Sequence, residues 1–387
     1  MTERLYYKDG GMSEFYAVVM SCKKEKNGRY AVMLDRTAFF PGGGGQECDT
    51  GELGYARVLE VSECDGEIVH YTDAEVPDDL VVKGKIDWEK RYRRMQNHTG
   101  EHIVSSLIYK KFGYGNVGFH MGSEDVTADF DGVLTEDELR EIEYEANLII
   151  YKNLRVYAEF PDADELLSMQ YRCKKELTGD VRIVTIEGCD RCACCAPHVS
   201  STGEIGMIRL LGFMHYKGGV RIHMLCGLDA LCDYRNKSAL IKHLCGKLSS
   251  KPEKLKEKIE RLSSETAESK KAAAEAENAL IDCKLSSLEI TDGNRLFVEP
   301  GMNMHGLARL ASGASEKVYG ISIAVSGDED GGYRYAAASK HGNLLPIAQA
   351  IGEVLDGKGG GSDKLIQGSI NAKIKDIKSF FESLGEN

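Results

Sequence analysis

Two short motifs, separated by a long stretch of sequence, constrain the fold of this chain more than any other feature. The first, His98-Thr-Gly-Glu-His102, places two imidazoles four residues apart, and the second, Cys194-Cys-Ala-Pro-His198, places a thiol and an imidazole at the same spacing. Side chains four residues apart on a helix or tight turn can face one cation. Three nitrogens and one thiolate form a tetrahedral ligand set that suits zinc. We therefore predict that the fold brings both segments together around one Zn²⁺ per chain.

A glycine-rich segment precedes these motifs. Residues 35–51 follow the apolar run 30–34 and contain four consecutive glycines, 42–45, that end at Gln46. Glycine adopts positive φ without steric cost and lets the backbone approach a ligand closely. A hairpin loop that binds nothing is the simpler explanation of such a run. The segment alone does not separate a ligand-lined cleft from an ordinary turn.

The order of these motifs resembles that of the alanyl-tRNA editing family, which comprises the editing domain of alanyl-tRNA synthetase and its freestanding relatives. The likeness covers roughly the first 230 residues. Its segments are Arg36-Thr37-Ala-Phe39, the glycine run with Gln46, Asp49-Thr-Gly51, both metal motifs, Thr202-Gly-Glu-Ile-Gly206 and Gly218-Gly-Val-Arg221. The resemblance implies a hydrolase that cleaves the ester between mistakenly attached serine or glycine and the terminal adenosine of tRNA(Ala).

The resemblance also implies roles for individual residues. Thr37 would hydrogen-bond the serine hydroxyl, and Gln46 would shape the pocket and position water. A polar group built to meet a hydroxyl separates serine from alanine better than size does, because the alanyl ester leaves that group unpaired. The other residues expected at the substrate are Arg36, Gly43, Gly44, Gly45 and Arg221.

The expected metal ligands are His98, His102, Cys194 and His198. Four protein ligands are typical of a closed zinc site, so we expect the metal to orient the substrate, with water activation if one ligand is loose. Between the cysteine and the histidine the family usually has two glycines and a threonine, whereas this chain has Cys195, Ala196 and Pro197. This departure keeps the ligand spacing but removes backbone freedom from the loop.

Three further cysteines, Cys189, Cys192 and Cys195, surround the thiol of the second motif. Together with Cys194 they could form a separate zinc knuckle, but no second cysteine pair with zinc-ribbon spacing follows. Only Cys194 has a histidine at ligand spacing. We therefore expect the other three cysteines to be neighbours of the site.

Length and cysteine use indicate a cytoplasmic enzyme. A chain of 387 residues can form two or three domains. Its first residues lack the basic start and apolar stretch of a signal peptide, and no run reaches membrane-spanning length. Twelve cysteines in a chain this long are typical of reduced thiols. We expect no membrane contact.

The net charge of -12 opposes a nucleic-acid partner, because phosphate neutralisation usually dominates such binding. One basic cluster, Lys90-Arg-Tyr-Arg-Arg94, nevertheless stands directly before the first metal motif. It is either a solvated helix face or a surface for the acceptor end of a tRNA. Binding of tRNA should therefore be modest and salt-sensitive.

Periodicity and the resemblance predict an α+β fold in four parts. These are a β-barrel-like N-terminal module (1–87), an α+β zinc-binding editing core (88–235), a helical or coiled-coil linker (236–286) and a C-terminal α/β domain (287–387). Strand-like runs are expected at 15–22, 30–34, 55–64, 67–71, 208–212 and 219–225, and helices at 88–112 and 135–153.

The linker carries a heptad pattern in which apolar or small residues alternate spacings of four and three. The positions are Leu255, Ile259, Leu262, Thr266, Ser269, Ala273, Ala276 and Leu280. Such a seam is typical of a coiled coil, although its alanine- and serine-rich second half is weak. Self-pairing through this helix and a single solvated spacer are both open, so a homodimer through the linker or the C-terminal domain is possible.

The C-terminal part contains Asp356-Gly-Lys-Gly-Gly-Gly-Ser-Asp363, which we expect to open onto a helix at 364–367. A glycine-rich loop at a helix N-terminus can bind phosphate, so Gly359, Gly360 and Gly361 are candidate tRNA contacts. A P-loop ending is absent, which argues against nucleotide hydrolysis. This part resembles the DHHA1-type domain that follows the editing domain in synthetases and also occurs in DHH-family phosphoesterases.

Only a short stretch precedes Thr37, whereas a synthetase carries an aminoacylation domain there. We therefore expect editing in trans, without activation of alanine by ATP. Two alternatives are a zinc-dependent phosphoesterase, suggested by the C-terminal resemblance, and a non-catalytic tRNA-binding protein. The Asp-His-His motif of the phosphoesterases is absent from the sequence, and the ligand set together with Thr37 and Gln46 argues against a purely binding role.

Overall fold

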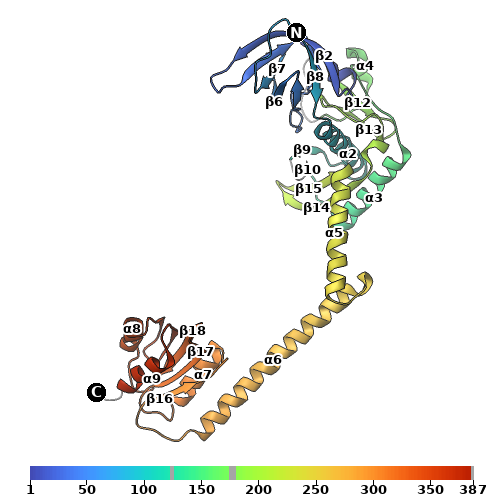
Figure 1. Cartoon of the computed structure of the whole chain (residues 1–387). Helices are drawn as coiled ribbons and strands as arrows, with labels where there is room; N and C mark the ends of the chain where they lie inside the picture. The colour runs from blue at the N-terminus through green and yellow to red at the C-terminus, as the bar shows by residue number, and fades with distance from the viewer. Residues whose placement is uncertain (123–125, 174–179, 385–387) are drawn as a thin grey trace. The chain divides into compact units, whose positions relative to one another are not determined.

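The protein is described by a computed structural model that covers residues 1–122, 126–173 and 180–384 (Figure 1). The chain divides into two compact units, Met1–His243 and Leu244–Asn387. Each unit contains both helices and sheets, which confirms the expected mixed α+β class. Among the described residues, no helix combines the length and the apolar character needed to cross a membrane.

The first unit begins with a closed six-stranded barrel in the order β2-β3-β7-β6-β5-β8. Its strands are β2 (Glu14–Lys24), β3 (Tyr30–Leu34), β5 (Gly51–Leu53), β6 (Ala56–Cys64), β7 (Glu67–Thr72) and β8 (Val81–Ile86). Alternate residues are buried along these strands, most regularly in β8, because successive side chains point to opposite faces. Three short elements are not part of the barrel: β1 (Glu3–Arg4), α1 (Leu5–Lys8) and β4 (Arg36–Thr37). Of these, β1 pairs with β4.

Helix α2 (Trp88–Phe112) follows the barrel directly and has the predicted bounds. Its N-terminus is capped by Asp87, whose carboxylate accepts a hydrogen bond from the Lys90 N–H, and its C-terminus ends at Gly113 in the left-handed region. Fifteen of its residues are buried, including both histidines of the first motif. A helix buried on nearly all sides is a rigid support for a site.

Helix α3 (Glu136–Lys152) packs against α2, and both helices contact a four-stranded antiparallel sheet. The sheet has the order β14 (Ile208–Tyr216), β15 (Gly219–Cys226), β10 (Val126–Phe130), β9 (Asn116–Met121). A second sheet contains β11 (Val156–Glu159), β12 (Ile183–Ile186) and β13 (Asp190–Ala193). The helix α4 (Ala163–Ser168) lies between β11 and β12, and the 3-10 turn η1 (Thr202–Ile205) follows β13. The core between these layers holds Ile103, Phe130, Ile142 and Met224.

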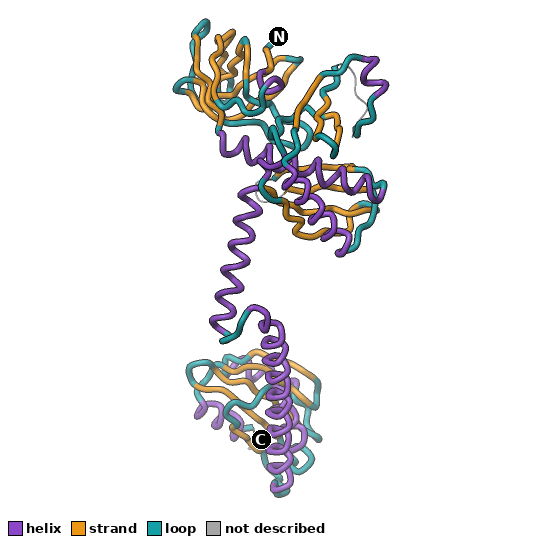
Figure 2. Tube along the Cα trace, turned by 90° about the vertical axis from the view of Figure 1, so that its right-hand side faces the viewer, coloured by secondary structure: helices purple, strands orange, loops and turns teal. Residues whose placement is uncertain are grey.

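The boundary between the two units falls within α5 (Gly227–Lys247), and the second unit then contains the 3-10 turn η2 (Pro252–Lys254) and the long α6 (Leu255–Ser287; Figure 2). The predicted heptad seam lies on α6 and is largely uncovered in the single chain. Ile259 and Leu280 are 47% and 49% exposed. The end of α6 packs on the helix and strands that follow it in the same unit, through Ile281 and Leu285.

The second unit is a five-stranded sheet with helices. The strand order is β16 (Arg295–Val298), β17 (Ser322–Asp328), β18 (Gly332–Ala338), β20 (Leu365–Ile370), β19 (Lys358–Gly361), and the helices are α7 (Met304–Ala314), α8 (Leu345–Val354) and α9 (Ile374–Ser383).

The predicted helix at 364–367 is wrong, because these residues enter strand β20. The three glycines form the edge strand β19 and pair with β20, so no helix N-terminus follows them. Steric demand explains two of the glycines. A Cβ on Gly359 would overlap the Gln367 carbonyl and one on Gly361 would overlap that of Leu365. The glycine run is thus a closely paired edge strand rather than a loop at a helix N-terminus.

Candidate metal centre

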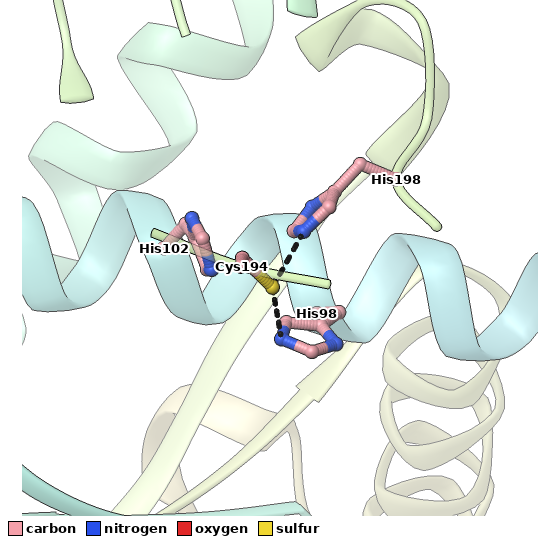
Figure 3. Close-up of side chains that lie close together, drawn as sticks. All are labelled: His98, His102, Cys194 and His198. Carbon is pink, nitrogen blue, oxygen red and sulfur yellow. Dashed lines mark hydrogen bonds between the residues drawn. The ribbon is translucent and has the colours of Figure 1, made fainter. Parts of the chain in front are cut away.

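Four ligand-type side chains meet in the first unit as the sequence predicts. Helix α2 supplies His98 and His102, and the loop after β13 supplies Cys194 and His198 (Figure 3). Their nearest ligand atoms all lie within 4.8 Å of one another. The three histidines are buried and the thiol is partly buried.

The distances in this cluster fit a tetrahedral zinc ion. Cys194 Sγ lies 3.5 Å from His98 Nε2 and 3.4 Å from His198 Nε2. Zinc bonds of about 2.3 Å to sulfur and about 2.0 Å to nitrogen give a tetrahedral sulfur–nitrogen edge of about 3.5 Å. The donor set and its spacing therefore match the ion.

Each histidine presents its other ring nitrogen to an oxygen acceptor. Nδ1 of His98 lies 2.8 Å from Gln46 Oε1, and Nδ1 of His198 lies 3.0 Å from Thr99 Oγ1. Thr99 donates its own proton to the Met95 carbonyl, so its oxygen accepts the one from His198. Such partners fix the tautomer that leaves Nε2 free to bind a metal.

The third histidine faces a carboxylate. Asp190 Oδ2 lies 3.5 Å from His102 Nδ1, and Arg172 binds both oxygens of the same carboxylate at 2.8 and 2.6 Å. Burial alone would raise the pKa of Asp190, but Arg172 and His102 lower that pKa to about 2. Arg172 also donates to the His102 carbonyl and therefore ties β13 to α2.

The titration of the ligands favours cation binding. Burial alone would raise the pKa of the Cys194 thiol, but the nearby His98 and His198 hold this pKa well below its usual value. The thiolate is the form that binds metal. Burial lowers the pKa of His198 to about 3, whereas Asp190 and the Cys194 thiolate outweigh burial at His102 and raise its pKa to about 9. A metal ion would displace that proton, because only neutral imidazole coordinates.

The unusual loop Cys195-Ala196-Pro197 is held from both sides. Arg182 donates to the carbonyls of Cys194 and Ala196, each at 2.9 Å. Ala196 is fully buried between Tyr6 and Phe40. These residues therefore anchor the ligand segment against the N-terminal part of the unit.

The glycine loop forms one wall of the centre. Gly43 and Gln46 exchange two backbone hydrogen bonds of 2.9 and 3.1 Å, and Met121 N–H donates to Gly45 O at 3.0 Å. Residues 42–45 all have positive φ. A Cβ on Gly45 would overlap the Phe119 carbonyl, so this position requires glycine. The loop is clamped between the barrel and β9 and carries Gln46 onto His98.

Comparison with known proteins identifies the family. The "Threonyl and Alanyl tRNA synthetase second additional domain" profile matches residues 181–223, which include the second metal motif. Alanyl-tRNA editing protein AlaX-M of Saccharolobus solfataricus is 41% identical over 226 residues, which cover 54% of this chain and 92% of that protein. The chain belongs to the alanyl-tRNA editing protein family.

Longer relatives extend the match. Alanyl-tRNA editing protein AlaX-L of Pyrococcus horikoshii is 29% identical, and the alignment covers 97% of this chain and 96% of that protein. The alanine–tRNA ligase of Ignicoccus hospitalis is 33% identical over 76% of this chain. This chain spans 33% of that ligase.

The residues expected at the substrate occupy different places in this editing-family fold. Gly44 lies beside the ring of His98, and Gly43 lies near the Cys195 thiol. Arg36 is exposed and pairs with Glu3 and Asp35 on the barrel. Arg221 on β15 pairs with Asp129 and stacks on Tyr216. The described contacts of the two arginines therefore lead away from the four ligands.

Thr37 is fully buried at the barrel. Its Oγ1 lies 2.8 Å from His70 Nε2 and accepts a hydrogen bond from the Phe39 N–H at 3.1 Å. The Nδ1 of His70 lies 3.1 Å from the Val32 carbonyl, which can only accept. His70 therefore donates from Nδ1, and its Nε2 accepts the proton of the Thr37 hydroxyl.

The basic cluster before the first motif is used internally. Arg91 is fully buried and binds Asp49, while Arg94 binds Glu47 and the Cys48 carbonyl. Lys90 pairs with Asp87, and Arg93 pairs with Asp229. The cluster is thus neither a solvated helix face nor a free basic surface. It joins α2 to the glycine loop and to α5.

Sequence reasoning missed the residues that support the ligands, Thr99, Arg172, Arg182 and Asp190, and the one that supports Thr37, His70. Thr99 lies inside the first motif, and Asp190 lies four residues before Cys194. Their closeness in sequence to the metal motifs could have identified these two residues as supports of the ligands. The others come from remote segments and become neighbours only through the fold. A second acidic and thiol group, Asp190 and Cys192, shares His102 with the centre.

Proposed function

We propose that this protein is an aminoacyl-tRNA hydrolase that removes serine or glycine from mischarged tRNA(Ala). The observation that carries this proposal is the convergence of three histidines and one cysteine beside the Gln46 loop. The near full-length match to an alanyl-tRNA editing protein supports the assignment and favours action on tRNA that was charged elsewhere. We place the enzyme in the cytoplasm.

The reaction makes modest demands on the site, because an aminoacyl ester is already activated. The residues must hold the terminal adenosine, admit water and stabilise the charge that develops on the carbonyl oxygen. Zinc held by His98, His102, Cys194 and His198 would supply a fixed positive charge that orients the substrate or polarises its carbonyl. The glycine loop, held by Gly45 against β9, is fixed beside these ligands.

Serine selection is assigned to Thr37. Because the Thr37 proton is committed to His70, its oxygen presents only a lone pair. A serine hydroxyl would therefore donate to Thr37, and an alanyl ester would leave that lone pair without a partner. Arg36 and Arg221, whose charges are paired with carboxylates, would act only by exchanging these partners for the substrate.

The second unit is assigned to tRNA binding. We propose the four parts 1–87, 88–235, 236–286 and 287–387, with the last a DHHA1-type domain that contacts tRNA near Gly359, Gly360 and Gly361. The exposed Ile259 and Leu280 on α6 support pairing of two chains through this helix.

The decisive experiment compares seryl, glycyl and alanyl esters on one tRNA(Ala). The protein should release serine or glycine and spare alanine, and metal analysis should give about one zinc per chain. The double variant Cys194→Ala/His198→Ala should lose both zinc and hydrolysis. Equal hydrolysis of all three esters would refute an editing function, and full zinc retention by the double variant would refute the ligand assignment.

A further inference from the structure

Arg182 differs from the other arginines around the metal centre. Arg91, Arg94 and Arg172 each bind a carboxylate. Arg182 is 9% exposed, and its only polar partners among the described residues are two backbone carbonyls of the ligand loop, each 2.9 Å from Nη1. Buried charges are normally paired with an opposite charge. The missing counter-charge therefore points to an anionic ligand.

One nitrogen of this guanidinium is open to such a ligand. Nε is enclosed without a hydrogen-bond partner, so it cannot be reached. Nη2 has no partner among the described residues and is not one of the enclosed atoms, so it is in contact with solvent. The Cζ of Arg182 lies 5.3 Å from the centroid of the Tyr7 ring, within the range of a cation–π contact. An anion that reaches Nη2 would therefore lie beside an aromatic ring.

Tyr7 is at the centre of a small group of rings and cations, which we call the Tyr7 cluster: Arg4, Tyr7, Phe160 and Arg182. The Cζ of Arg4 lies 5.7 Å from the centroid of the Tyr7 ring. Phe160 meets the same ring edge-on, with centroids 5.5 Å apart, and is 50% exposed. Exposed aromatic rings next to cations are the elements with which proteins bind unpaired nucleotides, because every base can stack on a ring.

The Tyr7 cluster is attached to the metal loop. Arg182 donates to the Cys194 carbonyl, and Cys194 is one of the four ligands. Tyr7, Cys194 and Cys195 also pack against the same small buried group, which contains Ala196. The cluster is therefore adjacent to the position that the ester of a substrate would take.

The charges of the cluster suit a polyanion. Arg4 is paired with Glu63, but Arg182 adds a positive charge that no carboxylate among the described residues offsets. Two acids at the start of α4, Asp162 and Glu165, are bound to the first turn of that helix. A backbone phosphate is an anion that Arg182 can bind through a charge-assisted hydrogen bond.

We propose that the Tyr7 cluster binds the single-stranded 3′ end of the tRNA, directly upstream of the terminal adenosine. This inference rests on the proposed function. Nη2 of Arg182 donates to a backbone phosphate, and Tyr7 and Phe160 stack on the unpaired base beside it. The cluster holds the substrate and takes no part in bond cleavage, so its loss should change KM more than kcat.

Substrates with and without the upstream nucleotides test the rings. Phe160→Ala and Tyr7→Leu, each in the full chain, should raise KM for seryl-tRNA(Ala) about 5- to 150-fold, which is the range of one lost base–aromatic stack. Seryl-adenosine lacks these nucleotides, so the ratio of the two KM values should rise by the same factor. Tyr151→Ala removes a ring that is 86% exposed on α3 and is the matched control, for which the ratio should stay unchanged.

Arg182 needs a separate measurement, because it also holds the ligand loop. The probe is an unacylated RNA that ends in CCA, with 2-aminopurine in place of the cytidine next to the terminal adenosine. Stacking on a ring should quench its fluorescence. Arg182→Gln removes one phosphate contact and should lower the slope of log affinity against log salt by about 0.7, whereas Phe160→Ala should weaken binding without changing that slope. Zinc content is measured for each protein, and affinities are compared at equal zinc loading.

The outcomes are distinct. If the wild-type protein hydrolyses seryl-tRNA(Ala) and Phe160→Ala and Tyr7→Leu match Tyr151→Ala, the Tyr7 cluster is overturned as a tRNA contact and the editing function stands. An equal loss on seryl-adenosine would also overturn it, because the rings would then act through the metal loop. If the wild-type protein hydrolyses neither substrate, the proposed function fails. Quenching of the probe that Phe160→Ala abolishes would then still support the cluster as an RNA surface, and an unquenched probe would overturn it.

Discussion

At the scale of single residues, the centre is defined as much by acceptors as by ligands. Gln46 and Thr99 each accept a hydrogen bond from Nδ1 of a different histidine, and the Asp190 carboxylate lies 3.5 Å from Nδ1 of the third; the three residues come from separate segments. Asp190 differs from the other two because it is charged and is itself bound by Arg172. It should therefore contribute most to the basicity of its histidine.

Asp190→Asn should lower zinc affinity about 10- to 100-fold, because His102 loses its carboxylate partner and Arg172 loses its counter-charge. Competition with a chelator of known affinity measures this effect. Asp129→Asn, which removes the carboxylate paired with Arg221 on the sheet, is the matched control and should leave zinc affinity unchanged. Equal zinc affinity of Asp190→Asn and wild type would remove Asp190 from the site.

His70 should make the stability of the barrel dependent on pH. Burial lowers its pKa to about 4 from an ordinary value of 6.5. As the pH falls below 6.5 the unfolded chain takes up a proton that the folded barrel excludes, so the free energy of unfolding decreases until about pH 4. The loss is roughly 3 kcal/mol.

The single tryptophan, Trp88, packs against the core of the first unit, and its fluorescence can follow denaturant unfolding across this pH range. His70→Phe cannot titrate and should show a flatter decrease, although it is less stable at pH 7 because Thr37 loses its acceptor. Parallel curves for the two proteins would show that another group causes the acid sensitivity.

The ligands could be read from the sequence because a cation demands fixed residue types at fixed spacing. The four predicted residues do meet. The roles of Arg36 and Arg221 could not be predicted from residue type and spacing, because the sequence gives the charge of an arginine but not the group that it binds. Only the fold reveals that both are paired with carboxylates and that Thr37 faces a buried histidine.

At the scale of elements, helix α2 organises the first unit. Its bounds follow from the capping residue Asp87 and the terminal Gly113, and the sequence predicts them correctly. The cluster at its start is different. Composition suggests a surface that binds phosphate, yet Arg91 is buried and forms a latch with Asp49 at the base of the glycine loop. Local charge alone could not predict burial, because the neutralising carboxylate lies far away in the sequence.

Breaking this latch should be costly. Arg91→Met leaves the Asp49 carboxylate buried without its cation and should lower the free energy of unfolding by about 3–5 kcal/mol. Arg91→Met/Asp49→Leu removes both charges and should recover part of this loss. Lys90→Ala, which breaks an exposed pair with Asp87, is the control and should cost below about 1 kcal/mol. Denaturant unfolding followed at Trp88 measures all three, and similar losses for Arg91→Met and Lys90→Ala would contradict the latch.

The glycine run 359–361 shows why a loop prediction failed. Glycine is chosen by several constraints, and sequence does not say which one applies. Here the constraint is that the edge strand β19 lies very close to Gly368 and Tyr335. Because the three glycines have no side chains, the alternation of apolar and polar residues that indicates a strand is absent from the sequence. Gly360 differs from its neighbours, since a Cβ there meets nothing within 4 Å.

At the scale of the whole molecule, we propose that the two compact units have separable tasks. The relative from Saccharolobus solfataricus aligns over 92% of its own length with little more than half of this chain. The family therefore has a member that aligns along nearly its whole length with only part of this chain. The first unit also contains its own barrel, sheets and core, together with all four ligands.

A fragment of residues 1–249, which ends after α5, should therefore fold, bind zinc and hydrolyse a minimal aminoacyl-RNA at close to the full-length rate. Its affinity for whole tRNA should fall at least about tenfold, because the second unit supplies the remaining contacts.

Gly360→Asp in the full chain refines the test, since the side chain fits the open space and adds a negative charge next to Gly359 and Gly361. If β19 meets phosphate, this variant should bind tRNA more weakly and keep its rate on the minimal substrate, and the difference should shrink as salt is raised. Undiminished tRNA affinity of the fragment would assign the second unit another task, and undiminished affinity of Gly360→Asp alone would move the tRNA contact away from β19.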